Sequence, residues 1–373
     1  MKIAMLGTRG VPASYSGFET CVEELGSRLV QRGHEVTVYC RAHHITYREP
    51  SYQDMRLVML PTVRNKYLDT IVHAFLSSLH ACTQRYDIAL YFIAGNSLVS
   101  WIPRLAGQRT VLNVDGLDWK REKWPSLAKQ YIRFAERMAT VLPSGFVTDS
   151  LAVQQYYKDT YGADSPCIAY GSDVTRRPPG ECLSRYGLEK DRYILFVGRL
   201  VPENCAHHLV GAFQRIRRPP DLKCVIVGSS AYAEEYITWL HSQAGPDTLF
   251  TDYLFGEGYQ ELGSNALVFV ETSAVGGTHP AVVEAMAFGN CVVVNGTPEN
   301  RETIGEAGLA YDGDQGGPAL AEILQMLLDQ PEQIERYREL ATRRAATHYS
   351  WNAVTDNYEA MFRRLLGTED PAT

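Results

Sequence analysis

The stretch KIAMLGTRGVPASYSGFET, residues 2–20, decides the fold class of this chain. It begins with a short apolar run, Lys2–Leu6, and passes through a glycine-containing turn into Phe18–Arg32, where apolar residues recur at helical spacing. A second apolar run, Glu35–Cys40, follows directly. A strand, a helix and another strand at this spacing predict a mostly parallel sheet covered by helices on both faces.

The same alternation continues along the chain and restarts once, after the turn-rich segment Arg176–Gly180. Because a hydrophobic core stops growing at roughly 250–300 residues, the length of the chain predicts two domains. We expect two doubly wound α/β domains, at residues 1–175 and 176–349, followed by an amphipathic helix within 350–373. Further strands are predicted at Asp87–Phe92, Arg109–Val114, Gly145–Thr148, Tyr193–Val197, Leu222–Val227, Leu267–Val270 and Cys291–Asn295.

Composition excludes several classes of protein. A charged fraction of 21% and an apolar fraction of 45% are typical of a globular chain, and a net charge of −7 gives no support for general nucleic-acid binding. No apolar run approaches the roughly 20 residues that span a bilayer, and the N-terminus has no signal-peptide pattern. The eight cysteines are scattered without a CxxC pair, so we expect reduced structural thiols in a cytoplasmic protein.

The turn after the first strand is a candidate ligand loop. Its glycines let backbone amides approach a ligand, and neither an arginine nor a tyrosine is needed to form a turn. The glycine spacing is not that of a dinucleotide-binding fingerprint, and no acidic residue follows the second strand to hold a ribose, so a dehydrogenase is disfavoured. The alternative is a turn needed only for packing. The candidate residues here are Arg9, Gly10, Tyr15 and Gly17.

A second candidate loop opens the second domain, where Gly198 and Arg199 follow a predicted strand. A guanidinium at the carboxyl edge of an open α/β sheet is well suited to phosphate oxygens. The alternative is an ordinary surface arginine.

A third candidate site is the start of a helix after Gly276 and Gly277. Thr278 is the expected N-cap, Pro280 suits the first turn, and the helix should end at Gly289. Amides at such a helix start, together with the helix dipole, favour an anion. Glu284, one turn further in, could accept hydrogen bonds from sugar hydroxyls; the alternative is a solvated helix residue.

Basic and aromatic residues are interleaved between positions 119 and 137, although the whole chain is acidic. Such a surface could rest on anionic lipid or receive an anionic acceptor, and indole rings suit a lipid interface. The alternative is a solvated helix face. The residues of this candidate membrane or acceptor surface are Trp119, Lys120, Arg121, Lys123, Trp124, Lys129 and Arg133, with Tyr131, Phe134 and Arg137 nearby.

The sequence gives no support for a metal site. Asp312-Gly313-Asp314 matches a DxD pattern but lies among turn-forming residues, so we expect a surface turn. No His/Cys cluster has zinc spacing, and we expect the adjacent pairs His43-His44 and His207-His208 to point apart.

Taken together, five segments in order resemble the family 4 glycosyltransferases of the GT-B fold, in particular a subgroup that includes bacterial rhamnosyltransferases of capsule and exopolysaccharide assembly. The resemblance covers nearly the whole chain. It implies two Rossmann-like domains facing across a cleft, an N-terminal acceptor domain, a C-terminal nucleotide-sugar domain, and a last helix that crosses back to the first. The segments are GTRGVPASYSGFETCVEEL, NVDGLDWKREKW, VGRLVPEN, VGGTHPAVVEAMAFGN and the Asn300-Arg301-Glu302 step.

The resemblance also implies roles for individual residues. Arg199, with Gly198 beside it, would bind the diphosphate of the donor, and Glu284 would bind the nucleotide ribose. Gly277, Thr278 and His279 would meet phosphate or donor sugar. The loop with Arg9, Gly10 and Tyr15 would line the phosphate and acceptor side of the cleft. No metal or cofactor is required in this family.

Three positions depart from the family pattern. Gly276 replaces the first Glu of a paired-Glu motif, Asn204 replaces a donor-binding Lys, and Asp115 replaces a His. We interpret these departures as signs of a different donor, with Asp115 and Arg199 as the catalytic residues. Asp115 would orient a sugar hydroxyl or help take the acceptor proton.

The expected function is therefore a retaining hexosyltransferase in polysaccharide biosynthesis. The donor is a nucleoside-diphosphate sugar, by subgroup dTDP-rhamnose, with UDP- and GDP-sugars as alternatives. The acceptor is a saccharide, lipid-linked at the cytoplasmic face of the membrane, where the protein would make peripheral contact with anionic lipid. Three alternatives stay open: transfer to a soluble acceptor such as a natural product, a sugar-nucleotide epimerase, and a non-catalytic GT-B assembly partner.

Overall fold

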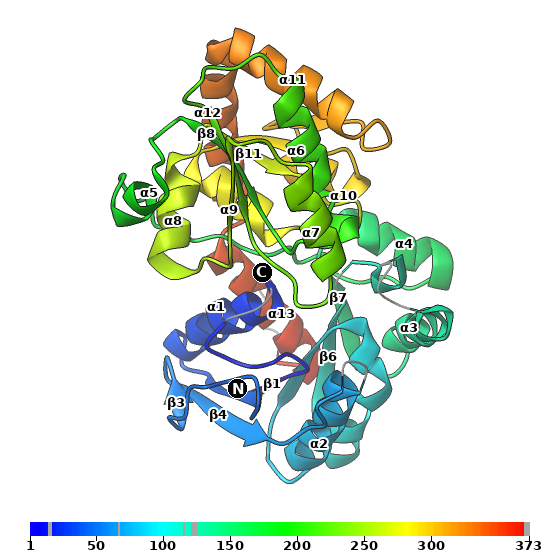
Figure 1. Cartoon of the computed structure of the whole chain (residues 1–373). Coiled ribbons are helices and arrows are strands. Elements are labelled where there is room, and N and C mark those ends of the chain that lie inside the picture. The colour runs from blue at the N-terminus through cyan, green and yellow to red at the C-terminus, as the bar shows by residue number, and fades with distance from the viewer. Residues whose placement is uncertain (14–16, 66–67, 115, 121–124, 369–373) are drawn as a thin grey trace. The chain divides into compact units, whose positions relative to one another are not determined.

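The computed structural model describes residues 1–13, 17–65, 68–114, 116–120 and 125–368. The chain divides into two compact units. Unit 1 consists of Met1–Gly171 together with Trp351–Thr373, and unit 2 is Ser172–Ser350. Each unit is built on its own sheet, and the two are described separately below (Figure 1).

The sheet of unit 1 has the strand order β3-β4-β2-β1-β5-β6-β7. All neighbours pair in parallel except the short β3, which is antiparallel to β4. The strands are β1 (Lys2–Leu6), β2 (Glu35–Arg41), β3 (Ser51–Tyr52), β4 (Met55–Leu60), β5 (Ile88–Phe92), β6 (Arg109–Val114) and β7 (Gly145–Thr148).

Helices cover both faces of this sheet, as parallel strands require. Along β1, Ile3 and Met5 pack into the core beneath α1 and α13, while Ala4 and Leu6 pack into the opposite core beneath α2. The helices of unit 1 are α1 (Gly17–Gln31), α2 (Asp69–Cys82), α3 (Ser126–Ala139), α4 (Leu151–Tyr161) and α13 (Trp351–Leu366). Three 3-10 turns complete it: η1 (Ala94–Val99), η2 (Ile102–Ala106) and η3 (Asp118–Lys120).

The last helix, α13, belongs to unit 1, which confirms that it returns to the N-terminal region (Figure 1). Its apolar face, including Tyr358 and Phe362, is part of the core beneath α1. The amide of Asn113 donates to the Tyr358 hydroxyl at 2.6 Å. The carboxylate of Glu359 accepts from Arg32 and bonds His34 at 2.6 Å, which ties α13 to the end of α1.

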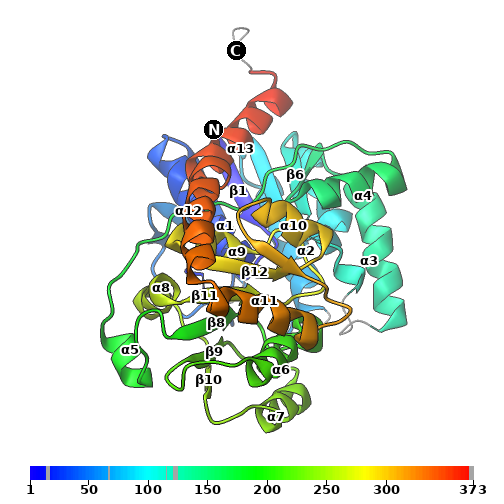
Figure 2. The same cartoon turned by 90° about the horizontal axis from the view of Figure 1, so that it is seen from above.

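The sheet of unit 2 has the order β10-β9-β8-β11-β12-β13, all parallel. One core joins alternate strand residues to α6, α7 and α11, and α11 lies beside α6 (Figure 2). The strands are β8 (Tyr193–Val197), β9 (Lys223–Val227), β10 (Thr248–Thr251), β11 (Val268–Glu271), β12 (Cys291–Asn295) and β13 (Leu309–Tyr311). The helices are α5 (Glu181–Tyr186), α6 (Ala206–Arg215), α7 (Glu234–Ser242), α8 (Gly256–Asn265), α9 (Pro280–Phe288), α10 (Pro298–Ile304), α11 (Gly317–Asp329), α12 (Pro331–His348) and the 3-10 turn η4 (Pro202–Asn204).

Both sheets reverse their strand order once, between β1 and β5 in unit 1 and between β8 and β11 in unit 2. Ligands of open α/β sheets bind at the carboxyl ends of the strands at such a point. The two doubly wound sheets confirm the predicted fold class. Within the described ranges, no helix is both long and apolar enough to cross a membrane.

Candidate functional site

The loops after β8 and β11 meet at the reversal point of unit 2. The amide of Ala274 donates to the carbonyl of Glu203 at 2.9 Å, and the Thr272 hydroxyl donates to the carbonyl of Asn204 at 2.5 Å. The structure therefore joins the Gly198–Asn204 loop to Thr272 and Ala274, the residues that lead from β11 into the Gly276–His279 loop.

Arg199 is half-buried in the first of these loops. The backbone before Arg199 packs closely on a second glycine. Gly228, directly after β9, has φ +136°, and a Cβ there would overlap the carbonyl oxygen of Gly198. Among the described residues, the Arg199 guanidinium forms no ion pair. Gly228 was missed by the sequence analysis, although it follows a predicted strand.

Asn204 is buried and holds the shape of this loop. Its amide nitrogen donates to the carbonyl of Arg199 at 2.9 Å, while its own carbonyl accepts from Thr272. The side chain thus fixes the backbone beneath Arg199, which makes Asn204 a positioning residue in this structure.

The expected N-cap of α9 is wrong by one residue. His279 is the N-cap, without a side-chain capping bond, and Pro280 is the first helical residue. Proline at this place fixes the helical φ, so the helix starts immediately before it. Thr278 is instead buried in the preceding loop. The predicted end is confirmed, since Gly289 terminates the helix with φ +83°.

The imidazole of His279 lies over Gly276. A Cβ built on Gly276 would be 2.5 Å from both Cε1 and Nε2 of His279, far inside ordinary contact distance. The lack of a side chain at 276, which departs from the family pattern, therefore provides the room in which the His279 ring lies.

Glu284 is held by a residue that sequence reasoning missed. The hydroxyl of Tyr259, on α8, donates to Oε2 of Glu284 at 2.5 Å. Burial and the neighbouring Glu284 carboxylate raise the pKa of Tyr259 well above its usual value, so the phenol stays protonated and remains a donor. No local sequence signal predicts this pair, because 25 residues separate its members.

In unit 1, the predicted loop lies at the carboxyl end of β1. Gly10 has φ +110°, and a Cβ there would be 2.8 Å from Cα of Cys40 on β2. The amide of Arg9 donates to the buried carboxylate of Glu19 at 3.0 Å, and its carbonyl accepts from the amide of Arg41. Gly17 is the first residue of α1. Tyr15 lies outside the described residues.

A polar cluster that the sequence analysis missed lies beside this loop. The Asp69 carboxylate, at the start of α2, pairs with the buried guanidinium of Arg41 at 2.9 Å and with Nε2 of His44 at 3.0 Å. Burial lowers the pKa of His44. Asp115, the predicted catalytic carboxylate after β6, lies outside the described residues.

The basic and aromatic segment is described only in part. The Arg133 guanidinium lies over the half-buried Trp119 ring, 4.0 Å from the ring centroid. Helix α3 buries Ile132 and Ala135 and leaves Arg133 exposed. Lys120 and Lys129 are also described, whereas Arg121, Lys123 and Trp124 lie outside the described residues.

The Asp312–Asp314 segment forms a turn closed by its own hydrogen bonds. Oδ1 of Asp312 accepts from the Asp314 amide at 3.0 Å, and Oδ2 accepts from the Gln315 side chain at 2.8 Å.

Two family models match the chain. Residues 1–173 match a domain of unknown function named DUF1972, and residues 184–344 match the family described as glycosyl transferases group 1. The O-antigen chain mannosyltransferase B of Escherichia coli is 28% identical over 198 residues. This match spans about half the length of each protein, 50% of this chain and 51% of the relative.

Solved structures match over the full length. Sucrose-phosphate synthase from Thermosynechococcus elongatus has a TM-score of 0.84 at 19% identity, covering 99% of this chain and 100% of that one. Anabaena HepE, solved in complex with UDP-glucose, has a TM-score of 0.80 at 18% identity, covering 98% and 100%. Residues 184–344 of this chain therefore match the group 1 glycosyl transferases, and the chain has the two-sheet GT-B fold of these solved structures.

Proposed function

We propose that unit 2 binds a nucleoside-diphosphate sugar at the carboxyl edge of β8 and β11. The observation that carries this proposal is that the Arg199 loop, after β8, is hydrogen-bonded to the segment after β11 that leads into α9, where Glu284 is held by Tyr259. A guanidinium and a helix N-terminus together suit a diphosphate, and a carboxylate held by a phenol suits a ribose diol. The related HepE was solved with UDP-glucose, a ligand of this class.

The chemical step that this site would assist is departure of the nucleoside diphosphate. As the bond between the sugar carbon and the phosphate oxygen breaks, negative charge grows on the β-phosphate. Arg199 and the amides at the start of α9 would stabilise that charge, and a preorganised donor of this kind is worth about 2.7–4 kcal/mol. The acceptor hydroxyl forms the new bond from the face the diphosphate leaves, so that configuration is retained.

Unit 1 would bind the acceptor, with Arg9, Gly10 and Gly17 at the carboxyl edge of its sheet. We keep Asp115 as the candidate catalytic carboxylate, since it follows β6 directly in the sequence. It would orient a hydroxyl of the reacting sugar or take the acceptor proton. By subgroup resemblance the donor is dTDP-rhamnose, and UDP- and GDP-sugars are the alternatives.

The donor proposal is tested by thermal unfolding with dTDP, UDP and GDP and their common sugars, in the wild type and in Arg199→Ala. A ligand at 100 times its dissociation constant stabilises by about 2.7 kcal/mol, which raises the melting temperature measurably. We expect one nucleoside diphosphate to shift the wild type and not the variant. No shift with any nucleotide would contradict the proposal.

We also propose that unit 1 docks on an anionic membrane, where it meets a lipid-linked saccharide. Its surface around α2, η2 and α3 exposes several large apolar side chains; α2 contacts η2, and α2 and α3 both contact η1. Leu127 and Phe134 of α3 are 79% and 53% exposed, and Leu105 of η2 is 77% exposed. Further exposed apolar side chains here include Phe75 and Leu79 of α2 and Trp101 beside η2.

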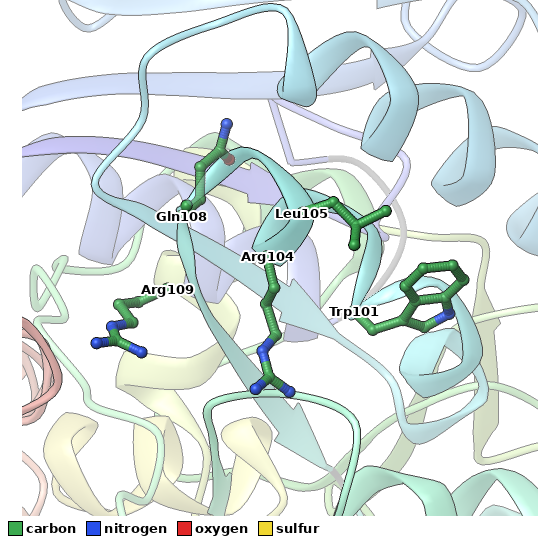
Figure 3. Close-up of a pocket in the computed structure, with 6 residues that line it drawn as sticks. Trp101, Arg104, Leu105, Gln108 and Arg109 are labelled. Carbon is green, nitrogen blue, oxygen red and sulfur yellow. The ribbon is translucent and has the colours of Figure 1, made fainter.

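Basic residues accompany this apolar surface, as contact with anionic lipid requires. Figure 3 shows Trp101, Arg104 and Leu105 around the η2 turn and Arg109 at the start of β6, lining a shallow hollow. Arg133 and Arg137 are exposed on α3 among its apolar side chains.

Sedimentation with vesicles tests the docking surface. We expect binding to vesicles that contain phosphatidylglycerol, less binding to neutral phosphatidylcholine, and release at high salt because exposed charges are screened. Leu127→Glu with Phe134→Glu should abolish binding, whereas Tyr232→Glu, at an exposed aromatic of unit 2, should not. Vesicle binding of the double variant equal to that of the wild type would overturn this docking surface. Absence of vesicle binding by the wild type would favour a soluble acceptor.

A further inference from the structure

Cys205, His207 and His208 lie together at the start of α6, in unit 2. The ligand atoms that these three side chains offer lie within 4.8 Å of one another. The expectation that His207 and His208 point apart is wrong, because their ring centroids are 4.6 Å apart in an edge-to-face arrangement. Cys205 precedes both histidines at the start of the helix with φ +51°.

A tyrosine holds each imidazole from a different side. Nδ1 of His207 bonds the Tyr236 hydroxyl of α7 at 3.0 Å, and Nδ1 of His208 bonds the Tyr311 hydroxyl of β13 at 3.0 Å. Hydrogen bonds of this kind fix the ring orientation and tautomer of metal-ligating histidines in known sites. All three candidate ligands are half-buried, so an ion from solution can reach them.

A second group of possible ligands, His43, His44 and Asp69 in unit 1, is less suited to a cation. There the Asp69 carboxylate is already paired with the buried Arg41 guanidinium, whose fixed charge opposes a metal ion.

We propose that Cys205, His207 and His208 form a binding site for a borderline divalent cation such as Zn²⁺. A thiolate and two imidazoles are a donor set that Zn²⁺ prefers, and three protein ligands leave one coordination position for water. Ligand atoms around tetrahedral zinc are separated by roughly 3.3–3.6 Å, so the side chains need to close by at most about 1.5 Å on binding. The site is distinct from the proposed diphosphate site and supplies no step of the transfer reaction.

The cluster lies directly after the Arg199 loop, so a bound ion would affect the structure of that loop. Cys205 directly follows Asn204, the residue that fixes the Arg199 loop, and the flanking tyrosines belong to α7 and β13. An ion bound here would therefore hold the start of α6 and the end of the Arg199 loop in place.

The full-length reduced protein, freed of metal by a chelator, is titrated with Co²⁺ and then with Zn²⁺. We expect a thiolate-to-cobalt charge-transfer band in the near ultraviolet, with visible bands of four-coordinate cobalt, and loss of both when Zn²⁺ displaces the probe. Cys205→Ser should remove the charge-transfer band, and Cys182→Ser, at a half-buried thiol of the same unit, should leave it unchanged. Absence of the band in the wild type would overturn the proposal.

Further variants separate ligation from folding. His207→Gln and His208→Gln should each weaken Co²⁺ binding at least tenfold, and Tyr236→Phe and Tyr311→Phe should weaken it by about 10–100-fold, as loss of partners that orient ligands does. Circular dichroism identifies variants that fail to fold. Unchanged affinity in folded variants of both histidines would contradict the site, whatever the outcome for the nucleotide donor.

Discussion

The contact between Gly276 and the His279 ring makes Gly276→Ala an informative substitution. The new Cβ would lie 2.5 Å from both Cε1 and Nε2 of His279, whereas ordinary contacts are 3.4–4 Å, so the ring must withdraw by about 1 Å. No positive φ is found at Gly276, so alanine strains the backbone little, and the ring is the movable end of a side chain. We therefore expect a change in stability within about 0.5 kcal/mol.

The effect on the proposed donor site should be much larger. Displacement of a positioned group by 1 Å can cost about 100-fold in rate, so kcat/KM for the nucleotide sugar should fall by about 10–100-fold. Nucleoside diphosphate affinity, measured by calorimetry, shows whether the loss arises in binding or in the sugar-transfer step. Gly245→Ala is the matched control, because a Cβ there meets nothing within 4 Å.

A double-mutant cycle with His279→Ala tests whether the effect of Gly276→Ala is transmitted through the His279 ring. If Gly276→Ala acts through the His279 ring, it should have little further effect once that ring is absent, giving a coupling of about 0.5–3 kcal/mol. Full additivity of the two substitutions in kcat/KM would refute the inference that His279 transmits the effect. Equal loss in the Gly245→Ala control would point to a general loss of loop order.

Three further predictions concern hydrogen-bonded carboxylates. Tyr259→Phe removes the donor to Glu284 and should weaken nucleotide affinity about tenfold in calorimetry, the effect of one hydrogen bond to a charged group; unchanged affinity would mean that Glu284 does not bind the ribose. Asp69→Asn leaves the buried Arg41 without its counter-charge and should lower the free energy of unfolding by about 3–5 kcal/mol in urea titrations. The control is the exposed pair Lys2–Glu35, where Glu35→Gln should lower the free energy of unfolding by less than about 1 kcal/mol. Burial raises the pKa of Glu359, but the hydrogen bonds from His34 and Arg32 lower it by a larger amount. The pKa of Glu359 in the folded protein therefore lies below its usual value. The stability that this carboxylate contributes should be complete above the ordinary glutamate pKa of about 4.3 and lost as pH falls through the lower folded value. Glu359→Gln should therefore reduce the loss of unfolding free energy at acid pH, measured by urea unfolding across pH. An unchanged loss would show that Glu359 does not contribute to it.

The core of the fold followed from the sequence because buried parallel strands are continuous apolar runs. Strands β1, β2, β5 to β9, β11 and β12 lie where they were expected, within one or two residues. The strands that were missed, β3, β4, β10 and β13, lie at or near sheet edges, where half-exposed residues such as those of β10 dilute the apolar pattern. An edge strand is recognised by the partner it pairs with more than by its own composition.

The loops of the candidate site could be located from the sequence. Their signals are local: the glycines, Arg199 and the proline that starts α9. The contacts within the site were decided only by tertiary structure. The Tyr259–Glu284 bond, the Arg41–Asp69 pair and the Cys205–His207–His208 cluster join side chains from different elements or from one strongly turned segment. Spacing along the chain cannot predict such contacts, because side-chain direction is set by how each element packs on its sheet.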